Sequence, residues 1–120
     1  MAAATKAART LTALATALAA AGTVTSTAWN MTNALGGLLV ARVTNTTAPT
    51  TNATITVNLS VDNVTWFQYL KFAVPTTAST TFDYAVEIPP SALYAQVVFV
   101  GGATNAQTCS AFGHELTSIQ

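Results

Sequence analysis

The clearest pattern in the chain is an alternation of apolar and polar residues near its middle. Apolar side chains occupy every second position from Ile55 to Val61, and Thr, Asn or Ser stands between them. A period of two is typical of a β-strand with one buried and one solvent-facing side. Asp62 and Asn63 follow, and both residue types favour turns because their side chains can bond the local backbone. The pattern predicts a β-hairpin at the centre of a β-domain, with Trp66 and Tyr69 in its second strand.

Further segments carry strand patterns as well. Residues 81–88 alternate as regularly as the first strand, and the two prolines that follow end the strand because proline cannot donate to a ladder. The other strands are predicted at 23–28, 38–44, 93–100 and 107–116. Six or seven short strands separated by turn residues predict an all-β protein, an antiparallel β-sandwich of jelly-roll or immunoglobulin-like type.

Residues 1–22 differ in composition, since they are rich in Ala, contain no acidic residue and end at Gly22. Three leucines recur there at spacings of three and four, as on one face of an α-helix. We therefore predict an N-terminal helical arm at 1–22 and a β-sandwich domain at 23–120. A short helix is marginal alone in water, so the arm needs a surface on its own domain or on another subunit. The candidate interaction residues of the arm are Leu11, Leu14, Leu18 and Arg9.

A secretory signal is the alternative interpretation of this segment. Lys6 and Arg9 would be its charged region, residues 11–21 its apolar region, and the small residues near its end the cleavage site. Thr12 and Thr16 interrupt the apolar run, which favours a retained helix.

Charged residues are scarce. Four Lys or Arg balance four Asp or Glu, and together they make up 7% of the chain, whereas apolar residues make up 51%. Ordinary soluble domains carry about a quarter charged residues, so this surface must consist mainly of Thr, Ser, Asn, Gln and Ala. Such a surface fits a protein that packs against neighbours or a secreted protein. Binding to nucleic acid needs many cations, so we expect no nucleic acid as a partner, and we expect no membrane.

The sequence contains no set of residues that predicts catalysis. His114 is the only histidine, and no nucleophile motif accompanies it. One Cys and one His cannot form a zinc cluster, and Cys109 is predicted to be a small buried residue. Asp83 and Glu87 would lie about 13 Å apart on one strand, too far for the paired carboxylates of a glycosidase. We therefore expect no enzyme activity, no metal and no cofactor.

Trp66, Phe67 and Tyr69 allow two interpretations. Aromatic side chains on sandwich strands usually belong to the core, which is the prediction for these three. On the surface they would instead form a platform for stacking on sugar rings. An exposed Trp66 or Tyr69 would therefore favour a carbohydrate-binding module.

Several stretches, in chain order, resemble a known group of proteins. After an Ala- and Thr-rich N-terminus come ALGGLLVARVTN, SVDNVTWFQY, YAVEIPPSALYAQVVFVGG and QTCSAFGHEL. From about residue 23 to 117 the chain resembles small virion structural proteins of tailed bacteriophages. This resemblance implies a β-sandwich without an active site that sits on the phage head as a decoration or cement subunit, or elsewhere on the particle.

The resemblance also sets the expected partners and location. We expect a capsid decoration protein that is made in the host cytoplasm and sits on the outer surface of the phage head. Its partners would be the major capsid protein and copies of itself, as a trimer or dimer, because the particle is symmetric. The alternatives are a neck or tail subunit of the virion and a carbohydrate-binding β-sandwich module.

Overall fold

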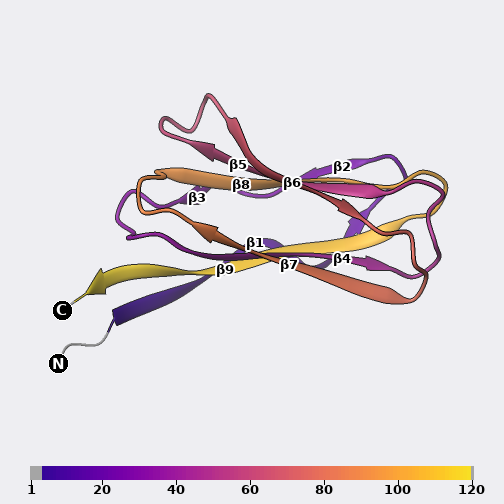
Figure 1. The fold of residues 1–120 in the computed structure, drawn as a ribbon, viewed down its shortest axis with the longest axis horizontal. Helices are drawn as coiled ribbons and strands as arrows, with labels where there is room; N and C mark the ends of the chain where they lie inside the picture. The colour runs from indigo at the N-terminus through magenta and orange to yellow at the C-terminus, as the bar shows by residue number, and fades with distance from the viewer. Residues whose placement is uncertain (1–3, 120) are drawn as a thin grey trace.

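The computed structural model describes residues 4–119, with side chains from Ala7 to Leu116. Residues 1–3 of the predicted arm and residue 120 of the predicted domain lie outside the described residues. Within 4–119 the chain forms nine β-strands and no helix. The strands make two antiparallel sheets that stack as separate layers (Figure 1). The all-β sandwich predicted from the alternation is confirmed.

The first sheet has four strands in the order β1-β9-β4-β7 and forms the lower layer in Figure 1. Its two inner strands, β9 and β4, pair antiparallel with each other, so the strand before the C-terminus lies inside the sheet. The bounds of its strands are Ala4–Leu18 for β1, Gln107–Ile119 for β9, Gly37–Asn45 for β4 and Thr80–Ile88 for β7.

The second sheet has the order β2-β8-β5-β6, and the short strand β3 also pairs with β8. Both β2 and β3 pair with β8, one near each end of it. The bounds of its strands are Thr23–Thr25 for β2, Trp29–Asn30 for β3, Tyr94–Val100 for β8, Ala53–Ser60 for β5 and Phe67–Val74 for β6.

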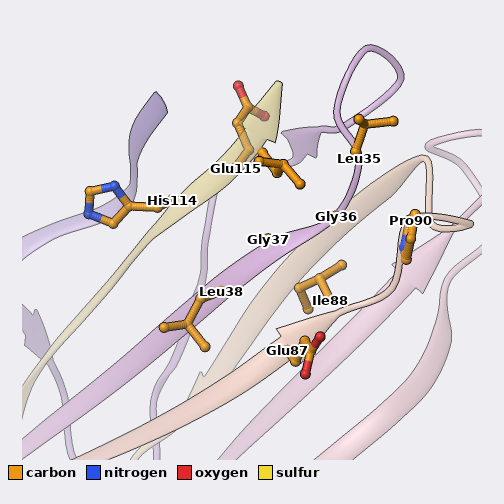
Figure 2. A pocket seen from close by; sticks show the side chains of 10 residues that line it. Leu35, Gly36, Gly37, Leu38, Glu87, Ile88, Pro90, His114 and Glu115 are labelled. Atoms are coloured by element: carbon orange, nitrogen blue, oxygen red, sulfur yellow. The ribbon is translucent and has the colours of Figure 1, made fainter. Parts of the chain in front are cut away.

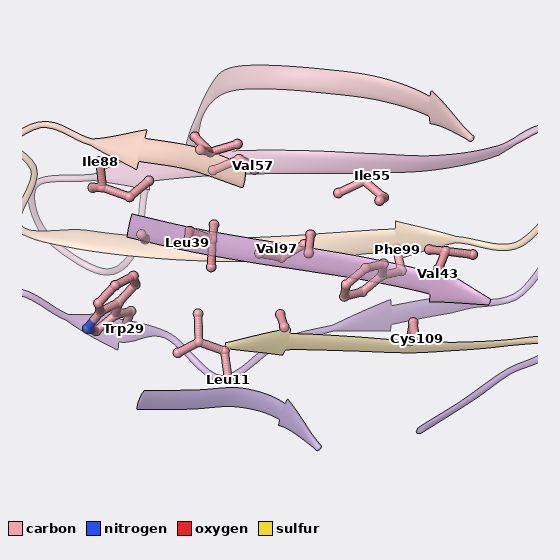
Figure 3. Packing of buried hydrophobic residues seen from close by; sticks show 14 of the residues in the cluster. Leu11, Trp29, Leu39, Val43, Ile55, Val57, Ile88, Val97, Phe99 and Cys109 are labelled. Atoms are coloured by element: carbon pink, nitrogen blue, oxygen red, sulfur yellow. The ribbon is translucent and has the colours of Figure 1, made fainter. Parts of the chain in front are cut away.

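One hydrophobic core fills the space between the sheets. Every second residue of the inner strands points inward, as the alternation predicted. Burying each large apolar side chain contributes about 1.5 to 3 kcal/mol, so this layer supplies most of the drive to fold. Figure 3 shows the central members, which are Leu39 and Val43 of β4, Ile55 and Val57 of β5, Val97 and Phe99 of β8, Ile88 of β7, Cys109 of β9, Trp29 and Leu11.

The predicted N-terminal helix is wrong, because residues 4–18 form strand β1 along β9. The ladder to β9 and the burial of Leu11 and Leu18 outweigh the helix preference of Ala, which amounts to less than about 1 kcal/mol per residue. Register shifts within β1, and a φ of 58° at Ala15, break the period of two. The leucine spacing therefore imitates a helix although the segment is a strand.

The predicted hairpin is confirmed as β5 and β6, with Tyr69 in β6 but Trp66 in the turn before it. The Asp62 carboxylate accepts hydrogen bonds from the backbone N–H of Thr65 at 2.8 Å and of Val64 at 2.9 Å. These bonds, with the one from Thr65 the largest cause, lower the pKa of Asp62. Asn63 takes the left-handed conformation that the turn requires, with φ of 61°. The tip of the hairpin projects away from the second sheet (Figure 1).

The loops gather at two opposite ends of the sandwich, because each loop joins the end of one strand to the start of the next. Loop 89–93 joins β7 to β8 at one end, and loop 46–52 joins β4 to β5 at the other. We call one the hairpin end, at the left of Figure 1, where β1 begins and β9 ends; its loops are 31–36, 61–66 and 89–93. The other is the loop end; its loops are 19–22, 46–52, 75–79 and 101–106.

Candidate functional site

A hollow of about 620 Å³ opens on the first sheet at the hairpin end. It forms where β4 begins, β7 ends and β9 passes beside them (Figure 2). Leu35 and Leu38 are 46% and 48% exposed there, so the chain itself leaves large apolar side chains in contact with water. The lining residues are Leu35, Gly36, Gly37, Leu38, Glu87, Ile88, Pro90, His114, Glu115 and Leu116.

The strand register explains the arrangement around Leu38. Leu38 lies opposite Glu87 on β7 and opposite His114 on β9, so the two polar residues flank the leucine on the same side of the sheet. Because side chains alternate along a strand, the next row on this side consists of Val40 with Ala85 and Phe112. The hollow therefore continues into an apolar outer face of the first sheet.

An ion pair ends this apolar face. Arg42 donates to Asp83 at 2.6 Å, and its guanidinium lies 5.5 Å from the centre of the Phe112 ring. Each charge is neutralised by the other, so neither offers a site for a separate charged ligand. The face beyond the hollow thus remains apolar and electrically neutral.

Glu115 lines the hollow, but its carboxylate is buried on the inner side of β9. It is 3% exposed, and its carboxylate accepts hydrogen bonds from Trp29 Nε1 at 3.0 Å and from the Arg9 guanidinium. Burying a carboxylate is costly unless it is paired and hydrogen-bonded, and these two donors meet that need. A Cβ at Gly113 would lie 2.9 Å from the Trp29 ring, so glycine there lets the indole reach the glutamate.

The four predicted interaction residues do not form one surface. Leu11 and Leu18 are 7% and 0% exposed and belong to the protein's own core, whereas Leu14 is 74% exposed on the opposite side of β1. Arg9 pairs with Glu115 beneath the hollow. Their contact with a partner stays a prediction, and among the three leucines only Leu14 has an exposed side chain.

A second apolar surface lies on the hairpin. Its exposed side chains are Val61, Val64, Phe67, Tyr69 and Leu70, with exposed fractions from 39% for Leu70 to 79% for Val64. The prediction that Phe67 and Tyr69 are core residues is wrong, and Trp66 is only half-buried. The cause is that β6 is the last strand of its sheet and shifts register beside Tyr69. In the sequence, the stretch VTWFQYL lacks a regular alternation of apolar and polar residues. This irregularity was the available sign that its side chains are not all core residues.

Among the described side chains, from Ala7 to Leu116, the remaining reactive groups form no further site. Cys109 is 2% exposed and burial raises the pKa of its thiol to about 11, which confirms a small core residue. Among the described residues, no three or more His, Cys, Asp or Glu side chains come together as metal ligands. The same residues include no helix long and apolar enough to span a membrane. The absence of enzyme activity stays a prediction.

No protein-family model matches the sequence, and no curated protein matches it. Similar folds occur among solved structures. The PBSX exported protein XepA gives a TM-score of 0.65 at 16% identity, over 93% of this chain and 37% of that one. Infectious bursal disease virus, Gx strain, gives 0.59 at 14% identity, over 95% and 32%. The pili called Bacillus endospore appendages give 0.54 at 14% identity, over 98% and 90%.

At such low identity these similarities show the fold alone. They place the chain among two-sheet β-sandwiches, in agreement with the strand topology. The chain spans about a third of the length of the first two proteins, so their sandwich is one part of a larger chain.

Proposed function

We propose that this protein is a non-enzymatic structural subunit of a bacteriophage virion, a decoration or cement protein on the outer surface of the head. Its partner is the major capsid protein. The attachment surface is the hollow at the hairpin end together with the adjoining outer face of the first sheet. The protein is made in the host cytoplasm and joins the head there.

The observation that carries this proposal is the 620 Å³ apolar hollow, where Leu35 and Leu38 remain about half exposed. Contiguous exposed apolar surface on a protein is a mark of a binding site. With 7% charged residues, the chain is also suited to burial against neutral protein surfaces. The names of two similar structures refer to a virus and to pili, which agrees with a structural role.

Attachment would stabilise the shell by removing apolar surface from water. Each bound copy bridges adjacent capsid subunits, and every Å² of apolar area that becomes buried contributes about 25 cal/mol. Decorated heads should therefore resist heat better than bare heads.

Occupancy of purified heads that lack this protein tests the proposal. Leu38→Asp places a charge in the hollow and should weaken binding by at least about tenfold. Val100→Asp is the matched control, because Val100 is similarly exposed, at 37%, but lies on the second sheet. Equal occupancy by Leu38→Asp and the wild type, with unchanged heat stability of the heads, would show that the hollow is not the attachment surface.

The position on the particle needs its own experiment. Immunogold labelling of intact virions should mark the head surface. Labelling confined to the neck or tail would replace the decoration role by that of a neck or tail subunit.

Carbohydrate binding is the second candidate function, and the exposure of Phe67 and Tyr69 at 60% and 42% favours it. Exposed aromatic faces stack on apolar sugar faces, and Trp66 stands beside them in the sequence. A glycan array tests the idea directly. A signal that is lost in Tyr69→Ala would support it, and an array without any signal would remove it.

A further inference from the structure

We infer that the hairpin joins two copies of this chain, edge to edge along β6, as a two-fold symmetric dimer. This surface lies on the second sheet and adjoins the hollow on the first sheet only at Tyr69, whose hydroxyl donates to Glu87 O at 3.4 Å. The inference concerns the protein alone in solution and does not depend on the presence of a head.

The backbone of β6 offers an edge for pairing. β6 pairs with β5 on one side and is the last strand in its sheet. Its C-terminal half leans on the first sheet, where Phe72 stacks on Tyr84 at 4.8 Å and the Tyr84 hydroxyl donates to Ala73 O at 3.4 Å. The stretch from Phe67 to Lys71 is exposed throughout, although the Tyr69 hydroxyl donates to Glu87 O of the first sheet at 3.4 Å. An edge strand with outward N–H and C=O groups is a template for another strand.

The side chains around this edge supply apolar area. Val61, Val64, Phe67, Tyr69 and Leu70 together leave roughly 500 Å² exposed, which lies in the upper part of the range for the largest patch of a monomer. The paired backbone adds to this and brings the contact toward the roughly 800 Å² per partner of a standard interface. The contact is therefore a small interface whose apolar part comes from these five side chains.

Symmetry and charge favour a second copy as the occupant. A two-fold axis lets one strand pair antiparallel with its own copy, so a single surface serves both sides. Lys71 is the one charge on β6. An axis near Tyr69 pairs Phe67–Lys71 with the same stretch of the partner and places Lys71 opposite the partner's Phe67, so the two lysines do not face each other. The Asp62 carboxylate is bound within its own turn and adds no repulsion.

The irregularities of β6 restrict the pairing to one arrangement. The register shift beside Tyr69 and the charge of Lys71 are devices that limit open-ended strand addition. The stretch that remains able to pair is Phe67–Lys71, between the hairpin tip and the covered Phe72. The expected product is a closed dimer, since pairing two edges uses up both of them.

Sedimentation of the purified full-length chain tests the inference. The wild type should be a dimer at micromolar concentration. Val64→Lys and Phe67→Lys should each raise the dimer dissociation constant by at least about tenfold, because they place like charges in the contact. Both side chains are well exposed, at 79% and 60%, so the fold itself should tolerate the changes, which circular dichroism checks.

Leu14→Lys is the matched control, since Leu14 is 74% exposed but lies on the first sheet. It should leave the dimer unchanged. A wild type that stays monomeric up to about 1 mM would overturn the inference, and so would a trimer or equal weakening by all three variants. Loss of head binding by Leu38→Asp with an intact dimer would separate this result from the proposed function.

Discussion

The two ends of the sandwich differ in what they leave exposed. At the loop end, a buried polar network ties three segments together. Asn45 is 0% exposed, its Nδ2 donates to Pro75 O at 2.8 Å and to Thr77 O at 3.0 Å, and its Oδ1 accepts from Gln107. Gln107 in turn accepts from the N–H of Gly102 at 2.9 Å. At the hairpin end, by contrast, the hollow and the apolar side chains of Leu35, Leu38 and Val64 are exposed to water.

The two ends therefore differ in whether the groups of their loops find their contacts within the chain. Polar loop groups can be satisfied by other loops of the same molecule, and at the loop end they are. Apolar side chains at the hairpin end gain nothing from water, so burial against another protein would release free energy there. The loop end therefore contributes internal cohesion, whereas the hairpin end is the attachment surface in the proposed function.

The largest effect should separate two neighbouring leucines of β4 near the hairpin end. Leu39 is 0% exposed in the core, whereas Leu38 is 48% exposed in the hollow. Leu39→Ala should cost about 2 to 5 kcal/mol of unfolding free energy, and Leu38→Ala less than about 1 kcal/mol. Urea denaturation measures both. Similar losses for the two variants would mean that the hollow is part of the core.

The next effect tests the network at the loop end. Asn45→Ala removes the partners of two carbonyl groups and of Gln107 in a buried place, so we expect a loss of about 2 to 4 kcal/mol. Asn52→Ala is the control, because Asn52 is an exposed residue of the neighbouring loop and should change stability by less than about 0.5 kcal/mol. The urea midpoint should fall at constant slope. A shift no larger than that of the control would refute the network's role.

A smaller effect is expected beneath the hollow. Arg9→Met leaves the buried Glu115 with Trp29 as its remaining donor, but the Arg9 side chain is 50% exposed and its attraction is screened by solvent. We expect a loss of about 1 to 2 kcal/mol. In the Glu115→Gln background the same change should cost less, and a double-mutant cycle measures that coupling. Additive losses would argue against the pair.

The smallest effect concerns the turn of the hairpin. Hydrogen bonds within the turn lower the pKa of Asp62, so the stability they supply is complete above the unfolded-state pKa of about 4 and is lost as the pH falls through the lower folded-state value. The wild type should therefore be more stable than Asp62→Asn at pH 7, and the two should converge toward pH 3. Thermal melts across this range check it, and a constant gap would contradict the carboxylate's role.

The sequence was most informative where strands alternate without interruption. β4, β5, β7 and β8 lie inside the sheets or keep a regular register, so their pattern is visible in one dimension. β1 was misassigned because its bulges remove the period of two and its Ala content favours helix locally, while the ladder to β9 that decides the matter is made by residues far along the chain.

The candidate surfaces were less predictable than the fold. The hollow combines a loop residue such as Leu35 with the ends of three strands, and no single stretch of sequence contains that arrangement. The exposure of Phe67 depends on β6 being an edge strand, and strand order cannot be read from alternation. Only the failure of alternation between Val64 and Leu70 pointed to it.

The pairing of β1 with β9 has a consequence for the order of folding. Arg9 and Glu115, which join across this ladder, lie 106 residues apart in the chain. Contacts of such long range close slowly, and during synthesis the N-terminal strand leaves the ribosome well before its partner exists. β1 is therefore made well before its ladder to β9 can form. We expect Leu11 and Leu18 to stay accessible to chaperones until β9 is made.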